Sequence, residues 1–204
     1  MELNVTVYEK FSNAFEQKCF RLIIEAYKTC LCEKVIQLDW NENDISQELF
    51  EKIDNNRLRL KWSITVSREF YLSKETTKNK GFADRLPRID FRLTNIFAMQ
   101  EYKYFCEAKR LKEKDSGLKR NYIKEGIDRY VSKKYPVGCM IGYILEGETD
   151  KTIQSINSLL EKYNRNTEIL IFKSNKLLKN YYESFHSDIG ILKHLLFDFT
   201  NISN

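Results

Sequence analysis

The chain of 204 residues contains little proline, glycine or histidine: two prolines, seven glycines and two histidines. It shows no internal repeat, low-complexity segment or linker, so we expect one domain spanning residues 1–204. Five cysteines are present, and Cys30-x-Cys32 has no second pair to complete a zinc site. The cysteines are therefore expected to be reduced thiols of a cytoplasmic protein.

Long apolar runs are also absent. No stretch approaches the roughly 20 residues of a membrane-spanning helix, and the first residues lack the basic-then-apolar pattern of a signal peptide. We therefore expect a cytoplasmic protein without a membrane partner. The net charge of +5 permits nucleic-acid binding without requiring it. Hydrophobic residues at 42% and aromatic residues at 13% exclude an intrinsically disordered chain.

The first third of the chain predicts two helices and a strand. Apolar residues recur at helical spacing over about 7–31, and Asn43 or Asp44 is expected to cap a second helix ending near Ile53. Alternation over 58–66 predicts a strand. Residues 68–82 are rich in lysine and predict a basic loop, which either contacts phosphates or is simply solvated.

Two strands at the centre of the sequence carry the candidate chemistry. They are expected over 86–93 and 102–109, where side chains alternate between faces. If the strands pair as a hairpin, Asp90, Glu107 and Lys109 converge on one side. Two carboxylates and an ammonium there suit a hard divalent cation and an attacking water.

The remaining segments predict an α/β fold with a central mixed β-sheet flanked by helices. A helix over 118–133 followed by an apolar strand over 137–146 indicates a βαβ crossover with parallel pairing. Thr149 or Asp150 is expected to cap a further helix ending at Tyr163. A short strand is expected over 168–172, and residues 191–199 predict a strand or short helix.

The segment Pro87-Arg88-Ile89-Asp90, followed by Glu107-Ala108-Lys109, resembles the PD-(D/E)xK signature of the restriction-endonuclease-like nucleases. The resemblance implies a restriction-endonuclease-like fold and a metal-dependent phosphodiesterase, an endonuclease rather than an exonuclease, acting on nucleic acid and most naturally DNA. It also implies Mg²⁺ as cofactor, with Mn²⁺ able to substitute. Similar proteins commonly serve in restriction, anti-phage defence or DNA repair.

The resemblance and the chemistry of the residues suggest individual roles. Asp90, Glu107 and the main-chain carbonyl of Ala108 would hold the metal. Lys109 would orient the water and stabilise developing charge, because neighbouring carboxylates raise a lysine pKa and disfavour a role as base. Glu42 would assist the metal from an early helix, unless it is an exposed loop residue. Arg129 would reach the scissile phosphate, unless it forms only a salt bridge.

Nucleic-acid binding is assigned to basic residues near the motif. No helix-turn-helix or zinc-finger signature is present, so specificity or activation is expected from a homodimer or a partner protein. Two alternatives stay open: a non-catalytic nucleic-acid-binding subunit that retains the nuclease fold, and a protein-interaction subunit in which the motif is an ordinary cross-strand salt bridge. The predicted phosphate-binding residues are Lys103, Arg110, Lys112, Lys114 and Lys119.

Overall fold

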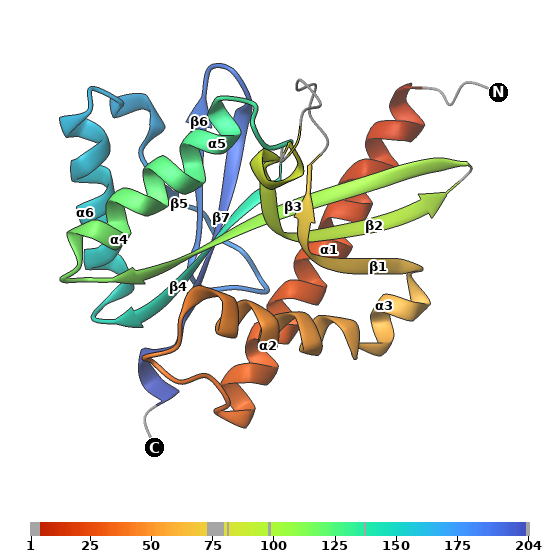
Figure 1. Ribbon diagram of the computed structural model, residues 1–204, viewed down its shortest axis with the longest axis horizontal. Coiled ribbons are helices and arrows are strands. Elements are labelled where there is room, and N and C mark those ends of the chain that lie inside the picture. The colour runs from red at the N-terminus through yellow and green to blue at the C-terminus, as the bar shows by residue number, and fades with distance from the viewer. Residues whose placement is uncertain (1–4, 73–79, 81, 98, 137, 203–204) are drawn as a thin grey trace.

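A single seven-stranded mixed sheet with helices packed against it organises the chain, as Figure 1 shows. The computed structural model describes residues 5–72, 80, 82–97, 99–136 and 138–202. The predicted α/β class with a mixed sheet flanked by helices is confirmed.

The strands run in the order β1-β2-β3-β4-β7-β6-β5 across the sheet. The pairs β3–β4 and β4–β7 are parallel, whereas the four outer pairs are antiparallel. The parallel β3–β4 pair confirms the predicted βαβ crossover. The strands are β1 (Ile64–Tyr71), β2 (Arg88–Phe97), β3 (Gln100–Lys112), β4 (Cys139–Glu146), β5 (Ile171–Phe172), β6 (Tyr181–His186) and β7 (Gly190–Asp198).

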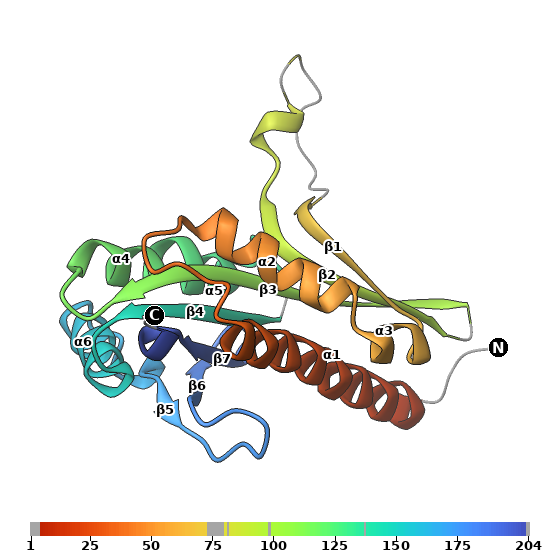
Figure 2. The same cartoon turned by 90° about the horizontal axis from the view of Figure 1, so that it is seen from below.

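Helices bury an apolar core on each face of the sheet. One core joins the sheet to α1 (Val5–Glu33) and α2 (Glu42–Asp54), and Figure 2 shows α1 running along the sheet. The other lies under α6 (Thr149–Lys162) and the crossover helix. That crossover comprises α4 (Ser116–Asn121), the π-helical segment η2 (Tyr122–Ile127) and α5 (Asp128–Val131).

The strand predicted over 58–66 is partly wrong. Residues 57–61 form the short helix α3 (Arg57–Lys61), and β1 begins only at Ile64. The side chain of Asn56 caps α3 by accepting from the Leu58 N–H at 2.9 Å. This local hydrogen bond favours a helical start over the strand that the alternation indicated.

Two predicted helix caps are also wrong. Asn41, rather than Asn43 or Asp44, caps α2 through its side chain. Thr149 is the first residue of α6, and its hydroxyl donates to Asp198 instead of capping the helix.

Other boundaries differ less. The crossover helix begins at Ser116 with Asp115 as its cap, the strand near 168–172 is reduced to Ile171–Phe172, and residues 190–198 form a strand. The predicted loop over 68–82 is wrong at its start, because residues 68–71 belong to β1, and its residues 73–79 and 81 lie outside the described residues. Val137, the first residue of the strand predicted over 137–146, also lies outside them. No helix in the described part of the chain has the length and apolar character needed to cross a membrane.

Candidate active site

The site lies where β3 extends beyond the start of β2. The antiparallel register ends with Phe91 opposite Cys106, and β3 continues to Lys112 with only β4 beside it. Main-chain N–H groups on the open side of β3 therefore need other acceptors. Asp90 accepts from the Ala108 N–H at 2.7 Å, and Glu42 accepts from the Arg110 N–H at 3.3 Å. Two carboxylates thus replace the missing strand.

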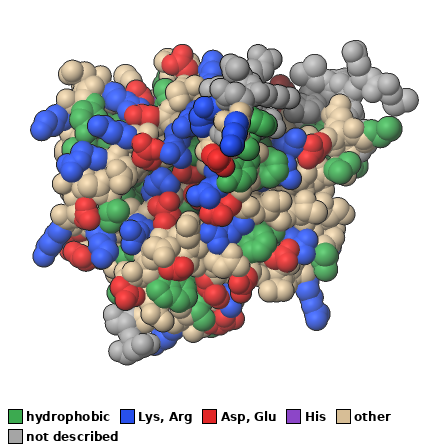
Figure 3. Space-filling view, in the orientation of Figure 1, with side chains coloured by type: hydrophobic (Ala, Val, Ile, Leu, Met, Phe, Trp, Pro, Cys, Tyr) green, Lys and Arg blue, Asp and Glu red, His purple; other side chains and the backbone are tan. Residues whose placement is uncertain are grey.

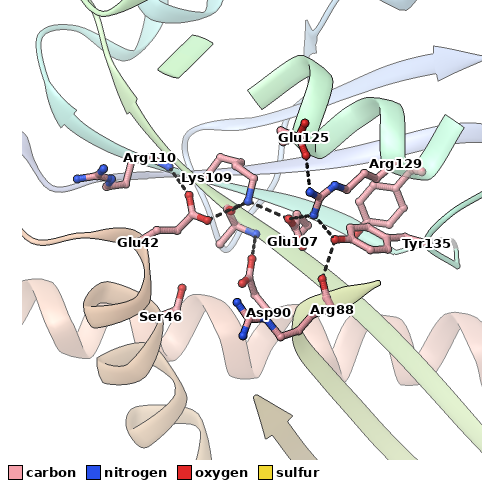
Figure 4. A network of polar contacts seen from close by, with 12 residues as sticks. Glu42, Ser46, Arg88, Asp90, Glu107, Lys109, Arg110, Glu125, Arg129 and Tyr135 are labelled. Atoms are coloured by element: carbon pink, nitrogen blue, oxygen red, sulfur yellow. Dashed lines mark hydrogen bonds and ion pairs between the residues drawn. The ribbon is translucent and has the colours of Figure 1, made fainter. Parts of the chain in front are cut away.

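Lys109 lies at the centre of this arrangement. Its ammonium is 2.8 Å from Glu107 Oε1, 2.9 Å from Glu42 Oε1 and 2.8 Å from the Ala108 carbonyl oxygen, as Figure 4 shows. These three acceptors use all three of its N–H donors. Burial alone would lower the pKa of Lys109, but the charges of Glu107, Glu42 and Asp90 outweigh it and raise this pKa above its ordinary value. Lys109 is therefore a positive group at neutral pH and not a proton acceptor.

Glu107 is the most deeply buried charged group of the site, with 2% of its surface exposed. Its Oε1 faces Lys109 and, at 3.5 Å, Arg129, whereas its Oε2 is buried and has no hydrogen-bond partner among the described residues. Burial and then the charge of Asp90 raise the pKa of Glu107 to about 8, against the opposing effect of Lys109. Lys109 and Arg129 therefore do not fully compensate the negative charge that an ionised Glu107 would carry.

Asp90 is in a similar position. Burial raises its pKa, although the charge of Lys109 and the hydrogen bond from the Ala108 N–H partly offset the shift. The buried Glu107 and the partly buried Asp90 both resist ionisation, which favours the approach of an additional cation.

The residues present fit a hard divalent cation. The carboxylates of Asp90 and Glu107 and the carbonyl of Ala108 supply oxygen ligands only, as Mg²⁺ prefers. The unpartnered Glu107 Oε2 is a buried acceptor that such an ion would satisfy. Across the described residues, no cluster of three or more Asp, Glu, His or Cys side chains is arranged to hold a metal, so the donor set is limited to two carboxylates and the carbonyl.

The helical side of the site is supplied by Arg129 of α5. Its guanidinium forms an ion pair with Glu125, donates to the hydroxyl of Tyr135 at 2.5 Å and faces Glu107. Tyr135 in turn donates to the carbonyl of Arg88 at 2.7 Å. One buried hydroxyl therefore ties the helix that carries Arg129 to the start of the strand that carries Asp90.

Gly126 allows this helix to approach the sheet. A Cβ at this position would lie 2.3 Å from Cε of Met140 and 3.7 Å from Cγ of Lys109. The π-helical segment η2 therefore packs closely on Met140 of β4, beside the central lysine. Such segments often occur at functional sites.

An open cleft gives access to these groups. One hollow of about 580 Å³ is lined by Asp90, Glu107, Lys109 and residues of the segment before β2. An adjoining hollow of about 520 Å³ is lined by Arg110 and Asn121. The two share five lining residues and so form one cleft; these are Glu42, Asn43, Arg88, Lys109 and Arg129. A larger cavity of about 860 Å³ lies apart from the motif, at the start of α6.

Of the five basic residues predicted to bind phosphate, only Arg110 lines the cleft. Lys103 forms an ion pair with Glu101. It lies six residues before Lys109 on β3, which places the two lysines roughly 20 Å apart along the strand. Lys119 is buried and donates to the carbonyl of Glu113. Lys112 is the last residue of β3, and the exposed Lys114 follows it.

The cleft contains basic residues other than those predicted to bind phosphate. Arg88, Arg129 and Lys134 line it together with the acidic residues, and Figure 3 shows cationic and anionic side chains interspersed over the middle of this face. Tyr135 and Lys134 were missed in the sequence. Their only signal there is the Lys133-Lys134-Tyr135-Pro136 segment ahead of the apolar strand.

The structure thus brings together Glu42, Asp90, Glu107, Lys109 and Arg129, the five residues to which the sequence assigned chemistry. No protein-family model, curated protein or solved structure matches the chain. Any conclusion on function therefore depends on the motif and on the geometry of this cleft.

Proposed function

We propose that the protein is a divalent-metal-dependent nuclease that hydrolyses phosphodiester bonds in nucleic acid, with DNA as the expected substrate and internal cleavage as the expected mode. The observation that carries the proposal is the meeting of Asp90, Glu107 and Lys109 in an open cleft, with one buried oxygen of Glu107 left unpartnered. The motif residues are distant in the sequence from Glu42 and Arg129, which join them in space.

Each residue has a role that follows from its position. Asp90, Glu107 and the Ala108 carbonyl would hold Mg²⁺ or Mn²⁺. When bound, the ion would neutralise phosphate charge and acidify a water molecule. The permanently charged Lys109 would orient that water and stabilise negative charge that develops at phosphorus. Arg129 reaches the same cleft from α5 and would bind a phosphate oxygen.

Substrate binding would come from cations along the cleft rather than from a base-reading element. Arg88 and Lys134 lie on the side of Asp90, and Arg110 lies on the other side of Lys109. Contacts with phosphates give affinity that depends on salt and carries little sequence information. Specificity or activation would then come from a second copy or a partner protein, as in a restriction or anti-phage defence system.

One observation favours the alternative of a non-catalytic subunit. Every N–H donor of Lys109 already has an acceptor, as in a structural ion-pair cluster. Against this, a structural cluster has no reason to keep a buried carboxyl oxygen unpaired, because an unpaired buried acceptor costs about 1–3 kcal/mol. The unpaired Glu107 Oε2 therefore favours the catalytic proposal.

Cleavage assays test the proposal. Plasmid DNA, single-stranded DNA and RNA are incubated with the chain and Mg²⁺, Mn²⁺ or EDTA. Glu107→Gln and Lys109→Met are expected to reduce cleavage by at least about a thousandfold, a typical loss for a central catalytic group. Glu101→Gln and Lys103→Met are matched controls, since they break an ion pair on the same strand outside the cleft. Activity that survives both cleft changes, or no cleavage in any metal, rejects a nuclease acting through this site.

Binding is tested separately from chemistry. Arg88→Glu with Lys134→Glu should weaken DNA binding and reduce the slope of log affinity against log salt concentration by about two. Lys103→Glu with Arg57→Glu, a double charge reversal outside the residues that line the cleft, is the control. Equal slopes for both doubly substituted chains would place the nucleic acid elsewhere.

A further inference from the structure

The ammonium of Lys109 occupies oxygens that the proposed metal ion would need. Two of its three acceptors, Glu107 Oε1 and the Ala108 carbonyl, belong to the donor set assigned to the metal. The third acceptor, Glu42, does not. The lysine is 12% exposed at its side chain and is held inside the site rather than at its rim.

Glu42 differs from the other two carboxylates in its bonding. Its Oε1 accepts from Lys109 at 2.9 Å, and its Oε2 accepts from the Arg110 N–H at 3.3 Å, so both oxygens are engaged with β3. Glu42 is also the first residue of α2, where the helix dipole favours a negative charge. By contrast, Glu107 keeps one buried oxygen without a partner. Glu107 therefore has an acceptor in reserve for a second cation, whereas both oxygens of Glu42 are already used.

We infer that Lys109 and a divalent cation compete for Glu107 and the Ala108 carbonyl, and that Glu42 is a positioning residue that retains Lys109 when the metal displaces it, instead of a metal ligand. This inference rests on the proposed function, because it takes the metal site as given. It assigns Glu42 a role opposite to the one expected from the sequence. Without metal, the ammonium balances part of the charge of the buried carboxylates. With metal, the ammonium stays in the cleft beside Glu42.

The inference predicts that removing a catalytic group improves metal binding. Lys109→Met deletes the competing ammonium, and isothermal titration with Mg²⁺ or Mn²⁺ should show affinity about tenfold tighter than that of the native chain, an effect of the size seen for groups just outside a metal's ligands. Lys103→Met, which removes a lysine paired with Glu101 on the same strand, should leave the affinity unchanged. Circular dichroism verifies folding, and Lys109→Gln serves if the methionine variant does not fold.

A double-mutant cycle defines the role of Glu42. If Glu42 acts through Lys109, Glu42→Gln should weaken metal binding about tenfold in the native chain and by less than about threefold in Lys109→Met, because the group that it retains is then absent. Equal weakening in both backgrounds would make Glu42 a ligand and overturn its assignment.

The failures are distinguishable. Unchanged or weaker metal affinity in both Lys109 variants, with clear binding by the native chain, overturns the competition but leaves the nuclease proposal intact. An absence of metal binding in the native chain and in every variant overturns both. Glu107→Gln should abolish binding in either background, and persistent binding in that variant would place the metal at another site.

Discussion

Replacing Glu107 by glutamine should make the stability of the protein depend less on pH between pH 5 and pH 8. The pKa of this buried carboxyl is raised to about 8 from an ordinary value of 4.5. Between these two values the native state holds a proton that the unfolded state has released. The proton's contribution to stability is therefore fully present below pH 4.5 and is lost as the pH rises towards 8.

The magnitude follows from the size of the shift. Each pH unit inside this window changes the free energy of unfolding by about 1.4 kcal/mol, so the native chain should lose about 3 kcal/mol through Glu107 between pH 5 and pH 8. Glutamine cannot titrate and loses none of this. The free energy of unfolding of Glu107→Gln, relative to the native chain, should therefore rise by about 3 kcal/mol over that range.

Urea unfolding followed by circular dichroism at pH 5, 6, 7 and 8, with chelator present, measures this difference. Other titrating groups occur in both chains and cancel, including His194, whose pKa burial lowers to about 3. Glu101→Gln is the control, because it makes the same substitution at an exposed residue of the same strand outside the cleft. A difference for Glu107→Gln that does not change with pH would refute the claim that burial and Asp90 oppose its ionisation.

Three further predictions concern the supports of the site and of the fold. Tyr135→Phe keeps the ring but removes the hydroxyl that contacts Arg129; cleavage assays should show a rate about tenfold lower, with KM nearly unchanged and stability reduced by only about 1 kcal/mol. Ser184→Ala leaves two buried histidines without a hydrogen-bond partner at Nε2, and urea unfolding should show a loss of about 2–4 kcal/mol. Asn56→Ala removes the cap of α3 and should cost about 1 kcal/mol in the same assay, whereas an unchanged midpoint would show that this cap adds no stability.

The strand pair that carries the motif was predictable because its signal is local. Alternation places Asp90 and Glu107 on one face, because the neighbouring apolar residues Phe91, Cys106 and Ala108 pack into the core on the other face. Glu42 was also found, because an acidic residue at a helix start is visible in the sequence. The contacts of Glu42 were not predictable, because Glu42 and Lys109 are 67 positions apart and meet through the packing of α2 against the sheet.

The cations of the cleft were harder to predict for a related reason. Lys103, Lys112 and Lys114 are near the motif in sequence, but a strand separates its residues by about 3.3 Å each and carries them away from Lys109. Lys134 and Arg88 line the same hollow although 46 positions separate them. The hydroxyl of Tyr135, next to Lys134, donates to the main-chain carbonyl of Arg88. Nearness along the chain is therefore a poor guide to which cations line the cleft.

The balance of charge in the cleft is the strongest argument for a ligand there. Glu42 and Glu107 both contact one ammonium, Asp90 accepts from the neighbouring Ala108 N–H, and Arg129 is shared between Glu107 and Glu125. A purely structural cluster of this kind is stable when every buried charge is paired, and replacement by apolar residues is often neutral or stabilising. This cluster instead keeps two carboxyl groups, Asp90 and Glu107, whose pKa values are raised, and it leaves one buried oxygen of Glu107 unpaired beside an open cleft. Such a site costs stability in the ligand-free chain, and a bound cation would recover it.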